Sequence, residues 1–157
     1  GKFEEEAAKV TAILEEIEGL LSHDDYYWLS SRIKKARRLP GALPDTDRRA
    51  RDIFTLWAGV IRDYACRDFY ELVQGYYKPR VTVYVQELRE RIRLGQRLLY
   101  NSQDLDAKYD AIEKKWVAEG FPLVETPARP SRVIDSVEKF LRAYPPGQVP
   151  TAPVKRT

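Results

Sequence analysis

The stretch DIFTLWAGVIRDYACRDFYELVQGYYKPR, residues 52–80, decides how this chain is interpreted. It is crowded with aromatic residues, namely Phe54, Trp57, Tyr64, Phe69, Tyr70, Tyr76 and Tyr77. Charged residues such as Asp63, Arg67 and Glu71 lie between them. Leu, Ile and Val fill a core without polar atoms, whereas buried Tyr and Trp need partners for their polar tips. We therefore expect either that these rings border a binding surface or that a polar network holds helices together here.

Apolar residues recur at helical spacing on both sides of this stretch. Phe3, Ala7, Val10, Leu14 and Ile17 lie three or four residues apart, which is typical of an amphipathic helix. The run VTVYV, residues 81–85, has the composition of a strand, but the helical spacing around it favours a helix. We predict an all-α fold, a bundle of six to seven mostly antiparallel helices, with helices near 3–22, 24–38, 45–57, 62–77, 79–99, 101–120 and 131–144.

Proline and glycine mark the ends of these helices. LPGALP, residues 39–44, separates the second helix from the third, and Pro79 is expected in the first turn of a long helix. Gly120 is expected to end the sixth helix. We predict one helical domain over residues 1–144 and a disordered, proline-rich tail over residues 145–157.

Composition limits the possible functions. The net charge is only +3, and acidic and basic residues alternate, so nucleic-acid binding is not expected. The one basic cluster, at residues 32–38, is expected to be a solvated helix end that complements the helix dipole. No stretch is long and apolar enough to span a membrane. The chain begins with Gly and contains no Met, so we expect it to be part of a longer polypeptide.

Residues for metal binding or acid–base chemistry are few. His23 and Cys66 are the only residues of their types and lie far apart in the sequence, so no metal site and no cofactor are expected. His23 beside Asp24 and Asp25 is expected to be a surface residue. Glycoside hydrolysis needs only two carboxyl groups. The candidate sets are Asp24/Asp25, Glu15/Glu16/Glu18, Asp63/Asp68 and Glu87/Glu90, and Lys or Arg lies close to most of them.

The pair Tyr76–Tyr77, followed by Pro79 and Arg80, allows two interpretations. One Tyr can belong to the core while the other hydrogen-bonds across a helix junction. Alternatively, the pair can form the edge of a sugar-stacking surface, because aromatic faces pack well on the C–H groups of sugars.

The motifs of this segment resemble the C-terminal helical domain of glycoside hydrolase family 89, the α-N-acetylglucosaminidases. They are Thr55-Leu56-Trp57, Gly59, Ile61-x-Asp63-Tyr64-Ala65 and Tyr76-Tyr77-x-Pro79-Arg80. The order of the flanking helices is also similar, so the resemblance covers nearly the whole chain. The chain departs from the family pattern at Cys66, Asp68, Phe69 and Glu71.

The resemblance implies a parent hydrolase that removes terminal α-linked N-acetylglucosamine from the non-reducing end of a glycan, with retention. The two catalytic glutamates of the family lie in a (β/α)8 barrel, so this chain is expected to hold no catalytic residue. It would dock on that barrel and form part of the pocket wall, with Trp57, Ile61 and Tyr64 facing the substrate. The resemblance also implies a secreted, periplasmic or lysosomal location. The alternative is a free-standing helical module that binds another protein through its aromatic cluster.

Overall fold

The computed structural model of the chain describes residues 1–56, 68–97, 103–119 and 130–145. Within these ranges the chain forms helices, turns and connecting segments but no strand, which confirms the predicted all-α class. The elements are α1 (Lys2–Leu21), the 3-10 turn η1 (Asp25–Tyr27), α2 (Leu29–Arg37), α3 (Thr46–Leu56), α4 (Tyr70–Leu72), the π-helical turn η2 (Val73–Tyr77), α5 (Lys78–Arg93), α6 (Gln103–Ala118) and α7 (Pro130–Ala143).

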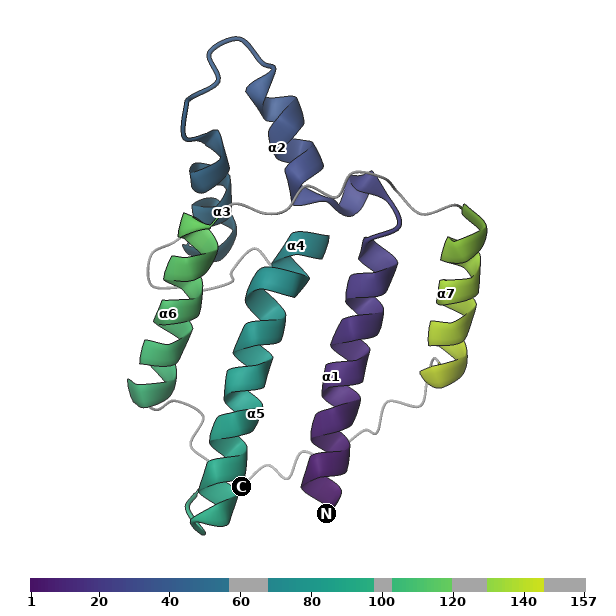
Figure 1. Ribbon diagram of the computed structural model, residues 1–157, viewed down its shortest axis with the longest axis vertical. Helices are drawn as coiled ribbons and strands as arrows, with labels where there is room; N and C mark the ends of the chain where they lie inside the picture. The colour runs from purple at the N-terminus through teal and green to yellow at the C-terminus, as the bar shows by residue number, and fades with distance from the viewer. Residues whose placement is uncertain (57–67, 98–102, 120–129, 146–157) are drawn as a thin grey trace, which may run out of the picture.

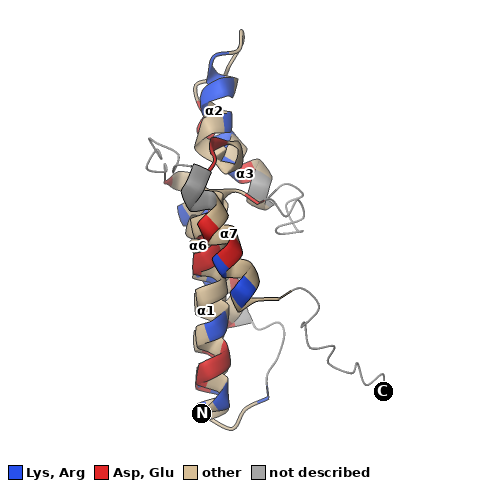
Figure 2. Cartoon of the chain, turned by 90° about the vertical axis from the view of Figure 1, so that its right-hand side faces the viewer, with Lys and Arg blue, Asp and Glu red and all other residues tan. Residues whose placement is uncertain are grey.

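Four long helices lie side by side in the order α6, α5, α1, α7, and each runs antiparallel to its neighbours (Figure 1). Helices α2 and α3 form a second antiparallel pair at the upper ends of α6 and α5 in this view. Seen from the side, the four long helices make a thin layer (Figure 2). Ion pairs join α1 to α5 at both ends of their contact, since Lys78 binds Glu18 at 2.5 Å and Arg89 binds Glu4 at 2.7 Å.

The predicted second helix, residues 24–38, is interrupted. The Asp24 carboxylate accepts a hydrogen bond from the Tyr26 backbone N–H at 2.8 Å and thereby starts only the short turn η1. Trp28 then adopts an extended conformation, and α2 begins at Leu29. The prediction was wrong here because the helix start at Leu29 is stabilised by a side chain from a distant part of the sequence, described below.

The predicted boundary between helices at residues 77–79 does not exist. Asp68 and Phe69 are not helical, and one continuous helical segment runs from Tyr70 to Arg93 through η2. Proline inside an α-helix removes one hydrogen bond, and its ring collides with the carbonyl four residues earlier. For Pro79 that carbonyl belongs to Gly75, which lies in the π-helical turn. The wider turn therefore lets the helix pass Pro79 without a break.

Helix α5 ends at Arg93, earlier than the predicted Leu99. Gly95 has a positive φ of 63°, a conformation that glycine adopts without strain. The Gln96 N–H donates to the Arg91 carbonyl at 2.9 Å, and the Gly95 N–H donates to the Ile92 carbonyl at 3.1 Å. These two bonds form a Schellman motif, which satisfies the last carbonyl groups of the helix.

The core lies where α2, α4, η2 and α6 meet. It consists of the buried side chains of Leu29, Ile33, Leu72, Tyr76 and Trp116. In contrast, α5 has no fully buried residue, and α1 has only Ala7. None of the helices in the described ranges has the length and hydropathy needed to cross a bilayer.

The link between α5 and α6 predicts a specific response to acid. Hydrogen bonds from Lys108 and Arg91 hold the pKa of the Glu87 carboxyl below its usual value. A lowered folded-state pKa stabilises the protein above the ordinary carboxyl pKa, and this contribution disappears as the pH falls through the lowered value. We expect Glu87→Gln to lose less stability than wild type when the pH falls from about 5 to about 3.

Urea unfolding at a series of pH values measures this difference. Glu15→Gln is the control, because Glu15 is exposed and forms no ion pair among the described residues. Parallel pH curves for wild type and Glu87→Gln would contradict the assigned role of the Glu87 ion pairs.

Candidate functional site

The residues predicted to bind substrate, Trp57, Ile61 and Tyr64, lie in residues 57–67, outside the described part of the chain. The residues on both sides of this segment pack against the rest of the domain. Thr55 is fully buried and its hydroxyl donates to the Arg51 carbonyl at 3.3 Å. Beyond the segment, Phe69 is half-buried against the core. The segment thus begins and ends on elements that pack into the folded domain.

A cleft of about 460 Å³ lies where η1, α2 and α3 meet the start of α4. Its volume is within the range of small-molecule sites. The cleft is mostly apolar, and its lining consists of Tyr26, Tyr27, Leu29, Arg32, Ile33, Ala36, Thr46, Ala50, Asp68 and Phe69. Asp68 directly follows the segment that carries the predicted substrate-binding residues.

Two exposed tyrosines border this cleft. The rings of Tyr26 and Tyr27 meet edge to face, with centroids 5.2 Å apart. The Arg32 guanidinium lies 4.3 Å from the Tyr26 ring centroid and donates to the Tyr26 carbonyl at 3.2 Å. Part of the basic cluster therefore orders an aromatic rim. Another part, Arg37, binds the Asp47 carboxylate at 2.6 Å.

Glu71 caps α2 from a distant part of the sequence. Its carboxylate is fully buried and accepts hydrogen bonds from the backbone N–H groups of Leu29, at 2.7 Å, and Ser30, at 2.9 Å. The first N–H groups of a helix have no acceptor within the helix, and negative charge is favoured at this end. Trp28, at the N-cap position, supplies no side-chain acceptor. The departure from the family pattern at Glu71 therefore has a structural role in this chain.

The aromatic residues after Glu71 are packed inside the domain. Tyr76 is 1% exposed, and its ring centroid lies 5.5 Å from that of Tyr77 and 6.1 Å from that of Trp116. The Arg80 guanidinium lies between two tyrosine rings, 4.9 Å from the centroid of Tyr76 and 4.8 Å from that of Tyr109. Of the two interpretations of the tyrosine pair, the structure therefore places Tyr76 in the core, where it cannot stack on a sugar.

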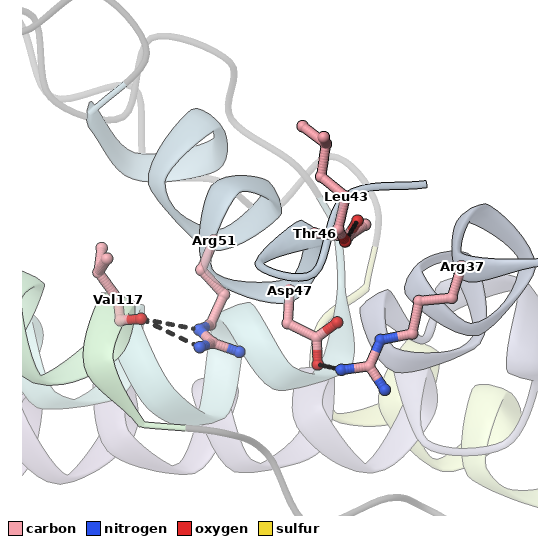
Figure 3. A network of polar contacts seen from close by, with 6 residues as sticks. All are labelled: Arg37, Leu43, Thr46, Asp47, Arg51 and Val117. Atoms are coloured by element: carbon pink, nitrogen blue, oxygen red, sulfur yellow. Dashed lines mark hydrogen bonds and ion pairs between the residues drawn. The ribbon is translucent and has the colours of Figure 1, made fainter. Parts of the chain in front are cut away.

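A polar network joins α3 to the end of α6 (Figure 3). The Arg51 guanidinium donates from Nε and Nη2 to the Val117 carbonyl, at 3.1 and 3.0 Å. In return, the Trp116 indole N–H donates to the Arg51 carbonyl at 3.1 Å. Burial lowers the pKa of Arg51, and the nearby negative charge of Asp47 opposes this shift. A cation at the C-terminal end of α6 also complements the helix dipole.

Several of the candidate carboxyl groups have structural partners, whereas Asp63 lies outside the described residues. Glu16 and Glu18 bind Lys139 and Lys78, and Glu90 binds Arg93. Hydrogen bonds to cations lower the pKa values of Glu4, Glu5, Asp45, Glu87 and Glu90. A general acid for glycoside hydrolysis needs a raised pKa. Of the carboxyl groups on described residues, Asp68 is the one that lines the cleft.

His23 joins two helices. It is half-buried, unlike the expected surface histidine, and its Nε2 lies 3.1 Å from the Ser136 hydroxyl on α7. Its Nδ1 is buried and has no hydrogen-bond partner among the described residues, so a carboxylate that would orient the ring for catalysis is absent there. No group of three or more His, Cys, Asp or Glu residues that could hold a metal ion occurs in the described ranges.

Sequence reasoning did not identify Glu71, Arg51 and Trp116 as a set of linking residues. Arg51 and Trp116 are 65 residues apart, and Glu71 lies 42 residues from Leu29. The local sequence offered one signal, the lack of a capping side chain directly before Leu29.

A comparison with protein families supplies the remaining observation. Residues 1–139 match the family described as the alpha-N-acetylglucosaminidase (NAGLU) C-terminal domain. A search of the curated proteins finds no match to the chain. The family match covers most of the chain and includes the core, the cleft and the segment with the predicted substrate-binding residues, so the chain belongs to the family of alpha-N-acetylglucosaminidase C-terminal domains.

Proposed function

We propose that this chain forms one side of the substrate pocket in an α-N-acetylglucosaminidase and docks on a catalytic (β/α)8 barrel of the same polypeptide. The parent enzyme would hydrolyse terminal, non-reducing α-linked N-acetylglucosamine. The observation that carries the proposal is the family match over residues 1–139, since this family is the C-terminal part of a glycosidase. The parent would act in a lysosomal, secreted or periplasmic location.

The proposal assigns the catalytic carboxyl groups to the barrel and the pocket wall to this domain. Retaining hydrolysis needs a nucleophilic carboxylate and a general acid that are about 5 Å apart. Hydrogen bonds to cations hold the pKa values of Glu4, Glu5, Asp45, Glu87 and Glu90 below the usual range. Such groups are poorly suited to give a proton to a leaving group. By the family resemblance, the acid and the nucleophile would come from the barrel.

The pocket wall would be formed by Trp57, Ile61 and Tyr64. Trp57 offers a flat ring that can pack on the C–H groups of a sugar, and Ile61 offers an apolar surface. The Tyr64 hydroxyl can hydrogen-bond a sugar hydroxyl. On either side of the segment that carries these residues, Thr55 is buried and Phe69 packs against the core.

The proposal predicts the kinetics of two variants of the full-length parent. Trp57→Ala would remove the stacking surface and lower kcat/KM by about 10- to 100-fold, and Tyr64→Phe would lower it by about tenfold through loss of one hydrogen bond. Hydrolysis of an aryl α-N-acetylglucosaminide measures both effects.

Tyr26→Phe provides a matched control, because Tyr26 is an exposed tyrosine at the cleft rim and outside the proposed pocket wall. Its kinetics are expected to equal those of wild type. This chain alone is expected to show no turnover. Wild-type kinetics in both Trp57→Ala and Tyr64→Phe would remove these residues from the pocket.

A further inference from the structure

The layer of four long helices has two broad faces with different chemistry. A stable domain normally buries the apolar side of one layer against a second layer. Over most of their length, α1, α5 and α7 form a layer without a second layer of described residues on it (Figures 1 and 2). The register of each helix shows which of its residues belong to each face.

The contacts of α5 define its four sides. Lys78 and Arg89 bind acidic residues on α1, whereas Arg80 and Glu87 bind Tyr109 and Lys108 on α6. At about 100° per residue, the first two side chains lie on one side of the helix and the other two lie opposite. The two remaining sides of α5 therefore belong to the two faces of the layer.

These two sides of α5 are different. One carries Val81, Leu88 and Ile92, and Ile92 is 49% exposed. The other carries Gln86 and Glu90, both exposed. The apolar side of α5 therefore belongs to one face of the layer, and its polar side belongs to the other.

Helix α1 shows the same division. Glu4 and Glu18 contact α5, and Glu16 contacts α7 through Lys139. Between these two directions, one side carries Val10, which is 42% exposed, and half-buried Ile17.

The opposite side of α1 carries exposed, small or charged residues, namely Ala8, Ala12, Glu15 and Gly19. Helices α1 and α5 are right-handed and run antiparallel. On each helix, the apolar strip follows from the side that contacts the other helix by a rotation of the same sense about the helix axis, counted from N- to C-terminus. For antiparallel neighbours, rotations of the same sense lead to the same face of the layer. The two apolar strips therefore lie on the same face of the layer.

Helix α7 extends this face. Lys139 contacts Glu16 on α1, and Ser136 contacts His23 just beyond the end of α1. Val137, about a third of a turn from the middle of these two side chains, is 40% exposed. On α7, Val137 is reached from the side that contacts α1 by a rotation about the helix axis. On α1, Val10 is reached from the side that contacts α7 by a rotation of the same sense. Because α1 and α7 run antiparallel, Val137 and Val10 lie on the same face of the layer. We define the apolar layer face as the side chains of Val10, Ile17, Val81, Leu88, Ile92 and Val137.

We infer that the apolar layer face is the surface on which the catalytic domain of the parent enzyme packs. This inference rests on the proposed function, because it takes the barrel as the missing second layer. Membership in a family of C-terminal domains makes a catalytic domain of the same enzyme available as a partner. Permanent interfaces are more apolar than transient ones, in agreement with the Val, Ile and Leu side chains of this face.

A tethered domain fits this face better than a second copy of the chain. A standard interface between separate proteins buries roughly 800 Å² on each partner. The partly exposed side chains of six residues contribute only part of that area. A domain on the same polypeptide has an effective concentration of about millimolar, so a smaller apolar area is sufficient to hold it.

The test compares two double variants of the full-length parent. Val10→Glu/Ile92→Glu places two carboxylates on the apolar layer face, and Ala12→Glu/Gln86→Glu places two on the opposite face of the same helices. All four positions are exposed, so helix content should be unchanged by circular dichroism. We expect only the first double variant to lose protection from hydrogen exchange at the catalytic-domain surface, with exchange about tenfold faster there.

Wild-type protection in the Val10→Glu/Ile92→Glu variant would overturn the inference. Loss of a parent dimer in this variant, with unchanged protection between domains, would also overturn it by assigning the face to a second copy. Equal loss of protection in both double variants would show that added charge, and not the position of the face, is responsible. Kinetics of Trp57→Ala test the proposed pocket wall separately, since they can be normal while the domain still docks through this face.

Discussion

Trp116→Ala is expected to destabilise the domain by about 3–5 kcal/mol, the usual range for removing a buried tryptophan. Trp116 is 2% exposed and packs with Leu29, Ile33, Leu72 and Tyr76, so alanine would leave a cavity in the core. The substitution would also leave the Arg51 carbonyl without the indole donor. Since small domains are stable by only about 5–15 kcal/mol, such a loss would remove a large part of the stability.

Urea denaturation of wild type and variant measures this loss. Trp116→Phe is the matched control, because it removes the hydrogen bond to Arg51 and leaves a much smaller cavity than alanine does. It is expected to cost about 1–2 kcal/mol. A change of less than about 1 kcal/mol in Trp116→Ala would show that the cluster of α2, α4, η2 and α6 is not the core of the domain.

Glu71→Ala is expected to cost about 2–4 kcal/mol, because it leaves two buried N–H groups at the start of α2 without an acceptor. Thermal unfolding would show this as a midpoint lowered by about 5–15 °C for a domain of this size. The physical reason is the position of the carboxylate, which accepts from both Leu29 and Ser30 at the positive end of the helix.

Two further variants separate the charge of Glu71 from its position. Glu71→Gln keeps one acceptor oxygen and removes the charge, so it should be intermediate between wild type and Glu71→Ala. Glu90→Ala removes a carboxylate of the same type from an exposed ion pair with Arg93 and should leave the unfolding midpoint nearly unchanged, because exposed ion pairs contribute little to stability. Equal stability of Glu71→Ala and Glu90→Ala would contradict the capping role.

The helices that could be predicted from the sequence are those with a regular apolar spacing. The boundaries of α1 agree closely with the prediction, and the described parts of α3 and α6 lie within the predicted ranges. The predictions of an uninterrupted helix at residues 24–38 and of a boundary at residues 77–79 were wrong, because a non-local contact and a π-helical turn replaced the local signals there. The domain limits at residues 144 and 145 remain predictions.

The candidate site was predicted only through family resemblance. Trp57, Ile61 and Tyr64 lie outside the described residues and remain proposed pocket residues. Of the aromatic residues that opened the sequence analysis, Tyr76 proved to be a core residue, and Arg80 lies between its ring and that of Tyr109. Near Tyr76, the aromatic residues therefore pack helices together and do not border a binding surface.

The sequence by itself determined the helical class, because apolar residues spaced three and four positions apart form a continuous apolar side only on an α-helix. It also determined the family, because residues 1–139 retain enough of its pattern. Only the tertiary structure decided that Glu71 caps α2, that Arg51 and Trp116 exchange contacts, and that Val10 and Ile92 remain uncovered while Leu72 is buried. Helical spacing identifies the apolar side of each helix. Which other helix covers that side depends on contacts between residues that are 40 or more positions apart.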